Sequence, residues 1–174
     1  MAPDAEPDPD GRPGATAGVT ALYQGHAVGL IRLAIVMLGD RVAAEDAVQE
    51  AFLGLYRHWD RLADPGRALT YVRSAVLNGC RNALRQRHRD VRRADAPLTV
   101  ESAEATVLVG AEHQRVLAAI RMLPDRQREA LVLRFYLDLS LDETARAMGI
   151  STGTVKSATS RAVAALGRML KEES

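Results

Sequence analysis

The sequence has little of what several common protein classes require. Only one of its 174 residues is a cysteine, Cys80, so an internal disulfide framework is excluded. Aromatic residues make up 4% of the chain and β-branched residues are few, a composition that argues against a β-sandwich and favours helices. The four histidines are scattered and none joins a Cys/His cluster, so we expect no structural zinc site.

Segments typical of secretion or membrane insertion are also missing. Residues 1–18 hold four of the seven prolines and no apolar stretch, so they do not resemble a signal peptide. The longest apolar segment, Leu30–Leu38, is broken by Arg32 and is too short to span a bilayer. We therefore expect a cytoplasmic protein without membrane insertion.

Common catalytic motifs do not occur. The chain contains no GxxxxGK[ST] loop, no HExxH and no GxSxG. We predict no catalytic residues, no metal ligands and no cofactor.

Charge is distributed unevenly along a chain whose net charge is only +1. Residues 73–93 carry +6 and residues 151–171 carry +4. Two separated basic blocks suggest two contacts with a polyanion such as nucleic acid. Two solvated helix faces explain the same charges about equally well.

Apolar residues recur at helical spacing in two groups of segments. Residues 1–18 read as a disordered acidic tail and residues 94–110 as a linker. The fold class we predict is all-α: a three-helix bundle within residues 19–93 and a four-helix domain within residues 111–174, joined by a flexible linker. The predicted helices span about 20–38, 42–59, 67–89, 111–122, 125–136, 141–148 and 152–170.

The sharpest local pattern lies between Ser140 and Leu170. Ser140 and Glu143 form a capping box, Gly149 suits a left-handed turn, and Ser151 caps the next helix. A short helix, a glycine turn and a second helix make a helix-turn-helix, whose second helix can enter a DNA major groove. An ordinary helical hairpin is the alternative. The residues predicted to point away from the buried face of the second helix are Lys156, Ser157, Thr159, Ser160 and Arg161.

Two helices of the first bundle have distinctive outer faces. The third helix interleaves amides, which can hydrogen-bond bases, with arginines, which can bind phosphates. A basic helix that only faces solvent would have the same sequence pattern. Its predicted exposed face comprises Arg73, Ser74, Asn78, Arg81, Asn82, Arg85 and Arg87. The second helix buries a stripe that includes Phe52 and Tyr56. Its outer face is acidic, which suits the helix dipole, yet it also exposes Leu53, which hints at a protein partner.

These patterns together resemble bacterial RNA polymerase sigma factors of the extracytoplasmic-function group. Ala44-Glu-Asp-Ala-Val-Gln-Glu-Ala-Phe52 followed by Trp59 resembles their polymerase-binding helix, and Tyr71-Val-Arg … Asn78 … Arg85-Gln-Arg87 resembles their −10 recognition helix. Leu123-Pro-Asp-Arg-Gln-Arg-Glu129, with Leu141-Asp-Glu-Thr-Ala, Gly149-Ile-Ser and Thr154-Val-Lys-Ser, is similar to their −35-binding domain.

The resemblance implies a promoter-specificity subunit that is not itself an enzyme. Its partners would be core RNA polymerase and promoter DNA, and the resemblance leaves an anti-sigma factor open as a third. The implied polymerase-binding residues are Asp46, Gln49, Glu50 and Leu53. The implied −10 DNA-binding residues are Arg73, Asn78, Arg81, Asn82, Arg85 and Arg87. The implied −35 DNA-binding residues are Thr154, Lys156, Ser157, Ser160 and Arg161.

Two other functions remain open from the sequence. A response-regulator-like activator could bind duplex DNA through residues 111–170 alone, but residues 20–90 do not show the alternating strands and helices of a receiver domain. A helical adaptor that binds only protein is the second alternative. Promoter-dependent transcription with core polymerase distinguishes the three.

Overall fold

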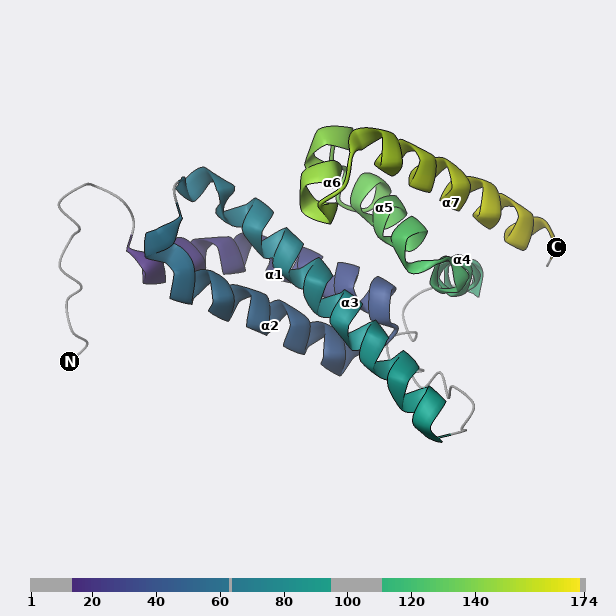
Figure 1. Ribbon diagram of the computed structural model, residues 1–174, viewed down its shortest axis with the longest axis horizontal. Helices are drawn as coiled ribbons and strands as arrows, with labels where there is room; N and C mark the ends of the chain where they lie inside the picture. The colour runs from purple at the N-terminus through teal and green to yellow at the C-terminus, as the bar shows by residue number, and fades with distance from the viewer. Residues whose placement is uncertain (1–13, 63, 95–110, 173–174) are drawn as a thin grey trace.

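We analysed a computed structural model of the protein, which describes residues 14–62, 64–94 and 111–172 (Figure 1). Residues 1–13 of the predicted tail and 95–110 of the predicted linker lie outside this description. The described chain is helical and contains no strand, so the predicted all-α fold with two small helical domains is confirmed. The elements are α1 (Ala15–Leu38), α2 (Arg41–His58), the 3-10 turns η1 (Trp59–Arg61) and η2 (Pro65–Arg67), α3 (Ala68–Ala94), α4 (Ala111–Met122), α5 (Asp125–Phe135), α6 (Leu141–Met148) and α7 (Thr152–Glu172).

The turn between α1 and α2 is only two residues long. Gly39 adopts φ 69°, and its backbone N–H donates to the carbonyl of Ile35, which ends α1. The side chain of Asp40 then accepts from the backbone N–H of Ala43 at 3.1 Å and begins α2. Gly39 thus ends the first helix and Asp40 begins the second, and the short turn makes the two helices antiparallel neighbours.

The first half of the chain is a three-helix bundle around fully buried aliphatic side chains, among them Leu33, Val48 and Leu55. The start of α1 packs closely on η1, since a Cβ placed on Gly18 would lie 2.2 Å from the indole of Trp59. The close approach of α2 to α3 at Gly79 is similar, because a Cβ there would lie 3.2 Å from that of Ala47. Small residues therefore set how closely these helices approach.

Three details differ from the sequence prediction. Helix α1 starts at Ala15 rather than near residue 20, and α3 continues to Ala94 rather than ending near residue 89. Tyr56, predicted on the buried stripe of α2, is 50% exposed. It follows the buried Leu55 directly, and a 100° step along the helix turns its ring toward solvent.

Helix α1 is long and apolar enough, by length and composition, to cross a membrane, and it is the one such helix among the described residues. Our sequence estimate rested on Leu30–Leu38 and missed the small residues that extend this stretch. In the structure α1 is a bundle helix that contacts both α2 and α3 and buries Leu30 and Leu33. Core helices of globular proteins have the same composition.

The second half is organised around α5. Six consecutive residues of this helix, 128–133, are buried. Because six residues cover more than one full turn, other parts of the chain must pack against every side of this segment. Helices α6, α7 and α1 all contact α5. An enclosed helix shows no amphipathic stripe, since each of its faces has a neighbour.

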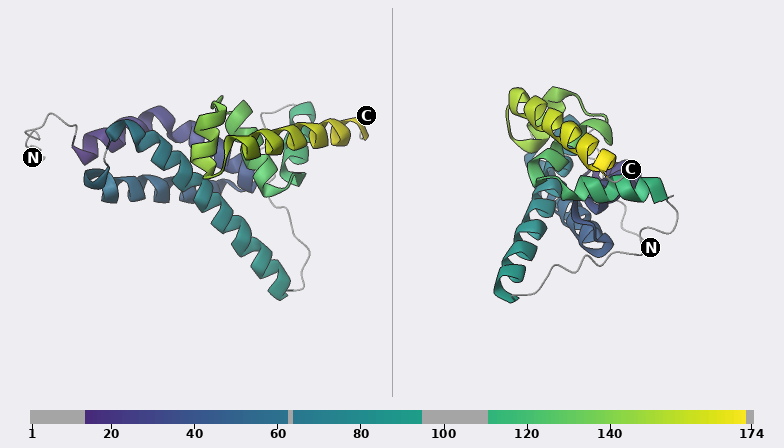
Figure 2. Two further views of the ribbon diagram at one scale, coloured as in Figure 1. Left: turned by 45° about the horizontal axis from the view of Figure 1, so that its top comes forward. Right: turned by 90° about the vertical axis from the view of Figure 1, so that its right-hand side faces the viewer.

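The two halves pack against each other. Figure 1 shows α4–α7 grouped beside the middle of α3, and both views in Figure 2 show the C-terminal part of α3 projecting away from the rest. Helix α3 contacts α6, and α1 contacts α4 and α5. Buried apolar residues from both halves, including Leu77 and Met148, belong to one hydrophobic cluster. We call this packing the closed arrangement.

Candidate polymerase-binding and nucleic-acid-binding surfaces

The outer face of α2 is open to solvent along its length. Asp46, Gln49 and Glu50 are exposed, and Leu53 beside them is 46% exposed. Glu45, one position before this group, is instead tied to Arg41 by an ion pair of 2.7 Å. The result is an acidic surface with exposed apolar side chains, since Val42 and Tyr56 of α2 are exposed as well as Leu53, and this composition suits a protein partner.

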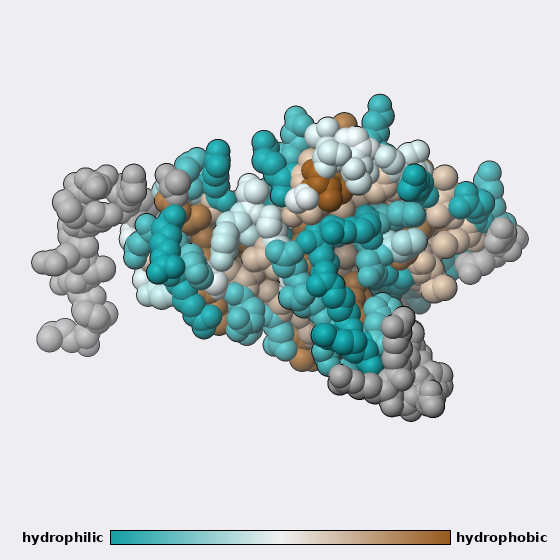
Figure 3. Space-filling model, in the orientation of Figure 1, coloured by the Kyte–Doolittle hydropathy of each residue, from teal (hydrophilic) through white to brown (hydrophobic). Residues whose placement is uncertain are grey.

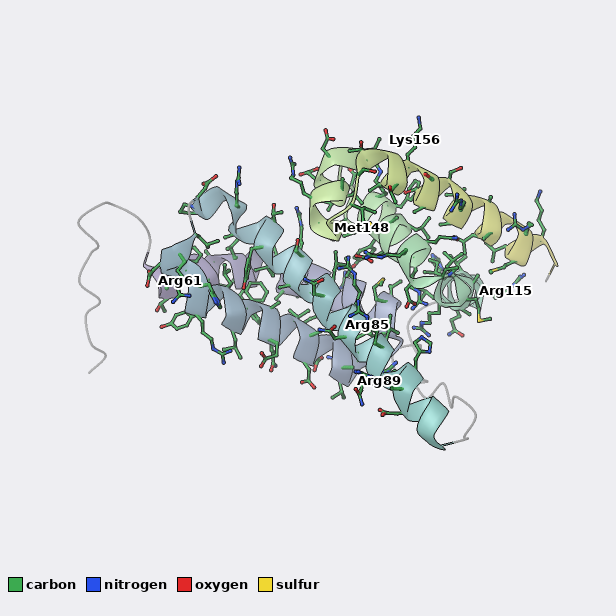
Figure 4. The ribbon with its side chains drawn as sticks, in the orientation of Figure 1. Arg61, Arg85, Arg89, Arg115, Met148 and Lys156 are labelled. Carbon is green, nitrogen blue, oxygen red and sulfur yellow. The ribbon has the colours of Figure 1, made fainter. Side chains whose placement is uncertain are left out.

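The face of α3 predicted to bind DNA divides into two parts. Asn78, Asn82 and Arg85 are exposed, and the amide oxygen of Asn82 accepts from Arg85 at 3.5 Å. Figure 3 shows a hydrophilic band along α3, and Figure 4 shows Arg85 and Arg89 on the part of this helix that extends beyond the second half. Three predicted residues, Arg73, Arg81 and Arg87, are only partly exposed.

Arg87 is engaged within the first half. Its guanidinium donates to the carbonyl of Leu38 and to the carboxylate of Asp40, both at 2.7 Å. The side chain of Arg87 is 38% exposed, so it lies at the edge of the predicted face with its guanidinium already paired.

Arg81 joins the two halves of the chain. Its guanidinium makes two hydrogen bonds to the carboxylate of Glu129 on α5, one from Nη2 to Oε1 and one of 3.1 Å from Nε to Oε2. Its Nη1 donates to Asn78 at 2.6 Å. The side chain of Arg81 is 15% exposed and that of Glu129 is 1% exposed. This interdomain ion pair removes Arg81 from the exposed face where the sequence placed it.

Burial determines the protonation chemistry around this contact. It raises the pKa of the Glu129 carboxyl, against the opposing effect of the hydrogen bonds from Arg81. It also raises the pKa of the Cys80 thiol to about 12, with a further contribution from the nearby Glu129 carboxylate. Cys80 is fully buried and carries almost no thiolate at neutral pH, so it is a packing residue and not a reactive one.

Arg73 lies one turn and a half before Asn78, where α3 meets the start of α6. Burial lowers the pKa of its guanidinium, and the Glu143 carboxylate opposes that shift. The two side chains are therefore close enough to interact electrostatically, although they belong to different halves of the chain. Arg81, through its hydrogen bonds to Glu129, lies on the part of α3 that the second half covers.

The sequence patterns did not indicate a structural role for Arg128, which is buried and only 7% exposed. Its Nη1 donates to the carbonyl of Met37 in the last turn of α1 at 2.5 Å, and its Nη2 donates to the carbonyl of Leu123 at 3.0 Å. Helix α1 has no basic residue in its own last turn. Arg128 and Arg87 supply cationic donors to its C-terminal carbonyls instead, which favours the negative end of the helix dipole.

The helix-turn-helix forms as the sequence predicts. The Ser140 hydroxyl accepts from the backbone N–H of Glu143, and the Glu143 carboxylate accepts from the backbone N–H of Ser140 at 2.8 Å. Gly149 takes φ 66° at the end of α6, and the Ser151 hydroxyl accepts from the backbone N–H of Thr154 at the start of α7. These caps fix where α7 begins and which side chains its first two turns present.

The predicted −35 residues of α7 are all exposed: Thr154, Lys156, Ser157, Ser160 and Arg161. Figure 4 shows Lys156 projecting from the outer side of α7, whereas Met148 of α6 lies on the side that faces α3. The Ser157 hydroxyl donates to the carbonyl of Gly153 at 2.7 Å, which keeps this side chain close to the helix. Thr159 was predicted to point away from the buried face, and this prediction was wrong. Its hydroxyl is buried, because Thr159 follows the buried Val155 by four residues and shares its side of the helix.

The described residues contain no group of three or more His, Cys, Asp or Glu side chains that could hold a metal ion. The exposed faces of α2, α3 and α7 present hydrogen-bonding, charged and apolar side chains.

Comparison with known proteins assigns both halves to one family. Residues 22–90 match the family model of Sigma-70 region 2, and residues 113–166 match that of Sigma-70, region 4. The chain is 32% identical over 142 residues to the RNA polymerase sigma-E factor of Streptomyces avermitilis, covering 82% of this chain and 79% of that protein. It is 33% identical over 159 residues to the ECF RNA polymerase sigma factor SigL of Mycobacterium tuberculosis, covering 87% and 88%.

Solved structures show the same fold. The sigma factor RpoE of Bartonella quintana, solved with the anti-sigma factor NepR, superposes with a TM-score of 0.73 at 24% identity, over 87% of this chain and 98% of that one. CnrH, solved with the cytosolic domain of CnrY, gives a TM-score of 0.69, also at 24% identity. Matches to both regions, in the right order and on one chain, show that the protein belongs to the extracytoplasmic-function group of RNA polymerase sigma factors, initiation factors that bind core RNA polymerase and direct it to promoters.

Proposed function

We propose that this sigma factor binds the polymerase and the two promoter elements through three different helix faces. The acidic face of α2 binds core RNA polymerase, the amide and arginine face of α3 binds the −10 element, and the N-terminal part of α7 binds the −35 element. The single observation that carries this assignment is that the three faces differ in chemistry while each presents exposed side chains. Within this proposal, residues 19–93 act as region 2, residues 94–110 as the linker and residues 111–174 as region 4.

The α2 face suits a protein surface better than a nucleic acid. The carboxylates of Asp46 and Glu50 would repel phosphate, and the exposed Leu53 adds apolar area that a protein partner can bury. We assign polymerase binding to Asp46, Gln49, Glu50 and Leu53.

The α3 face suits an opened DNA strand. Asn78 and Asn82 can hydrogen-bond base edges that are exposed once the strands separate, while Arg85 can hold the phosphate backbone. Arg73 and Arg81 would add two further cations to the same face once they are released from the second half. Arg87 retains its place in the proposal only as a neighbour of this face, since its guanidinium already has two partners in the first half.

The α7 face suits the major groove of duplex DNA. Ser157 and Ser160 are small enough to permit close approach, and Lys156 and Arg161 on either side can contact base edges or phosphates. Thr154 lies in the first turn, where backbone N–H groups also favour phosphate.

Three further statements belong to the proposal. The chain is not itself an enzyme, and it lends promoter choice to the polymerase. It works in the cytoplasm, where the polymerase and the DNA are. Because two proteins of the same fold were solved with NepR and CnrY, an anti-sigma factor is a third class of partner for this chain.

Reconstituted transcription is the test of this function. Purified chain is mixed with core RNA polymerase and a randomised pool of DNA fragments, and the transcripts are sequenced. We expect transcripts that start at a fixed distance from shared −35 and −10 sequences only when the chain is present. A response-regulator-like activator would instead bind duplex DNA without the chain joining the polymerase, and a protein adaptor would give no DNA-dependent signal.

A further inference from the structure

The hydroxyl of Ser157 has a defined hydrogen-bonding role on the exposed side of α7. Its Oγ lies 2.7 Å from the carbonyl oxygen of Gly153, one turn earlier in the helix. A carbonyl oxygen can only accept a hydrogen bond, so the proton in this bond is that of Ser157. A hydroxyl has one proton and two lone pairs, and with the proton turned back to the helix only the lone pairs face outward. Ser157 therefore presents an acceptor and no donor to a molecule that α7 contacts.

The other proposed −35 residues have a different hydrogen-bonding capacity. Lys156 and Arg161 are exposed and carry only donors, because an ammonium and a guanidinium have no acceptor. The hydroxyls of Thr154 and Ser151 bond each other at 2.8 Å, and either of them can be the donor. Ser157 thus supplies a defined acceptor to a face whose charged side chains supply donors.

The acceptor of Ser157 and the donors of Arg161 lie on one side of α7. The two residues are four positions apart, so they are neighbours on the helix surface. Val155 and Ala158 are buried, which leaves the side of Ser157 open to solvent. A rise of 1.5 Å per residue separates Ser157 from Arg161 by about 6 Å along the helix axis, roughly the rise of two base pairs. Within a major groove, this side of α7 would offer an acceptor and a set of donors to two nearby base pairs.

An acceptor distinguishes the two chemical kinds of base edge in the major groove. On a given strand, adenine and cytosine present an amino group there, whereas guanine and thymine present a keto oxygen. The Ser157 lone pairs can accept from an amino group. A keto oxygen gains a hydrogen bond only if the Ser157 hydroxyl gives up its bond to the Gly153 carbonyl. The amino base therefore leaves one hydrogen bond more in the complex than the keto base does.

We propose that Ser157 is a specificity-determining residue that selects an amino base, adenine or cytosine, at one position of the −35 element. This inference rests on the proposed assignment of α7 to that element. The bond to the Gly153 carbonyl makes Ser157 a positioned acceptor, and the small side chain lets a base edge come close enough to donate to it.

Promoter selection by the holoenzyme tests the proposal. A DNA pool with a randomised −35 element is transcribed by core polymerase and the chain, and base frequencies among the transcribed promoters are compared with those of the starting pool. We expect one position to favour adenine or cytosine over guanine and thymine on one strand by about threefold to tenfold, the value of one neutral hydrogen bond. Ser157→Ala removes the acceptor and strengthens the helix, so it should remove this preference and leave the other positions unchanged.

Two further variants show whether the hydroxyl acts as an acceptor. Ser157→Thr keeps a hydroxyl that can bond the carbonyl four residues earlier, so it should retain the amino-base preference. The matched control is Ser160→Ala. The Ser160 hydroxyl is exposed and has no hydrogen-bond partner within the described part of the chain, so its loss should leave the amino-base preference intact.

Each outcome decides the matter in one direction. An amino-base preference that is lost in Ser157→Ala and kept in Ser157→Thr and Ser160→Ala supports the proposal. A Ser157-dependent position that favours guanine or thymine overturns it, because the hydroxyl would then be the donor. Unchanged selection by Ser157→Ala also overturns it. That last result leaves the proposed function standing if Arg161→Ala still weakens −35 binding, and the assignment of α7 fails as well if it does not.

Discussion

The two DNA-binding faces proposed for this sigma factor have similar chemistry but different surroundings. The α7 face combines hydroxyls with Lys156 and Arg161, and each of its predicted residues is exposed. The α3 face combines amides with arginines, yet Arg81 is bonded to the second half and Arg87 to the α1–α2 turn. The difference comes from the neighbouring helices rather than from the residue types, so a basic side chain in a predicted face is not by itself a free one.

This comparison also suggests an order of events on a promoter. The residues proposed to bind DNA on α7 are all exposed, whereas Arg81 of the proposed α3 face is held by Glu129 of the second half. Variants that remove one face at a time can test whether the two faces depend on each other.

The largest effect should come from the α2 face, which both DNA faces require for polymerase-dependent binding. Asp46→Ala with Leu53→Ala should abolish association with core polymerase in a pull-down assay, while the free energy of unfolding changes by about 0.5 kcal/mol or less because both side chains are on the surface. Gln24→Ala with Val28→Ala is a matched control, since it removes one exposed polar and one exposed apolar residue from α1. Retained binding by the first variant would mean that α2 is not the polymerase-binding helix.

The next effect should come from the exposed part of the α3 face. Asn78→Ala with Asn82→Ala should leave polymerase association intact but reduce promoter opening at least tenfold, given about 1–3 kcal/mol for each lost base contact. Permanganate footprinting measures the opening. A template with a pre-melted −10 region distinguishes the cause: recovery there means that the amides assist strand separation, and continued failure means that they bind the unpaired bases. Normal opening on the intact promoter would contradict the assignment of α3.

A smaller effect is expected at α7. Lys156→Ala and Arg161→Ala should each weaken −35 binding by the holoenzyme, by about 1–3 kcal/mol with altered sequence preference where the residue contacts a base. A residue that contacts only phosphate should instead lower the salt dependence by about one unit without changing preference. Arg168→Ala removes the same charge two turns farther along α7 and should have little effect. Equal losses at positions 161 and 168 would indicate general charge attraction rather than a recognition helix.

The smallest effect concerns pH and the start of α6. The hydrogen bond from the Ser140 backbone N–H, with that of the Ser140 hydroxyl, holds the pKa of the Glu143 carboxyl below its usual value. A carboxyl with a lowered pKa in the folded state adds stability above its unfolded pKa, and this stability is lost as the pH falls through the folded pKa. The melting temperature of Glu143→Gln should therefore lie below that of the unaltered chain at pH 6, and the difference should shrink as the pH falls through the lowered pKa of the folded state. Asp142→Asn, in the same turn but outside the capping box, should show a weaker pH dependence.

The helices were largely predictable, because apolar spacing and caps are local. The capping box of Ser140 and the left-handed Gly149 were recognised from four residues and one glycine, and both occur in the structure. The exposure of Leu53 on α2 followed from its position between acids on the polar side of the helix. The family resemblance, drawn from the same motifs, is confirmed by the matches to both regions.

Contacts between the two halves were not predictable from local patterns. Arg81 and Glu129 are 48 residues apart, and each is a residue type that helices commonly expose. The burial of Leu77 and the enclosure of α5 follow from the same long-range packing. Arg87 is different, since its partners Leu38 and Asp40 lie within the first half and its side chain is still partly exposed.

The most direct test of the covered α3 face is the ratio of two DNA affinities measured on the free chain. Fluorescence anisotropy at low salt compares Glu129→Gln with the unaltered chain, first on a single-stranded −10 oligonucleotide and then on a −35 duplex, both taken from promoters that the holoenzyme selects. We expect the substitution to tighten binding to the −10 strand at least tenfold and to leave binding to the −35 duplex within about twofold, because only the first face has an arginine, Arg81, held by Glu129. Equal changes on the two probes, or none on either, would contradict the account.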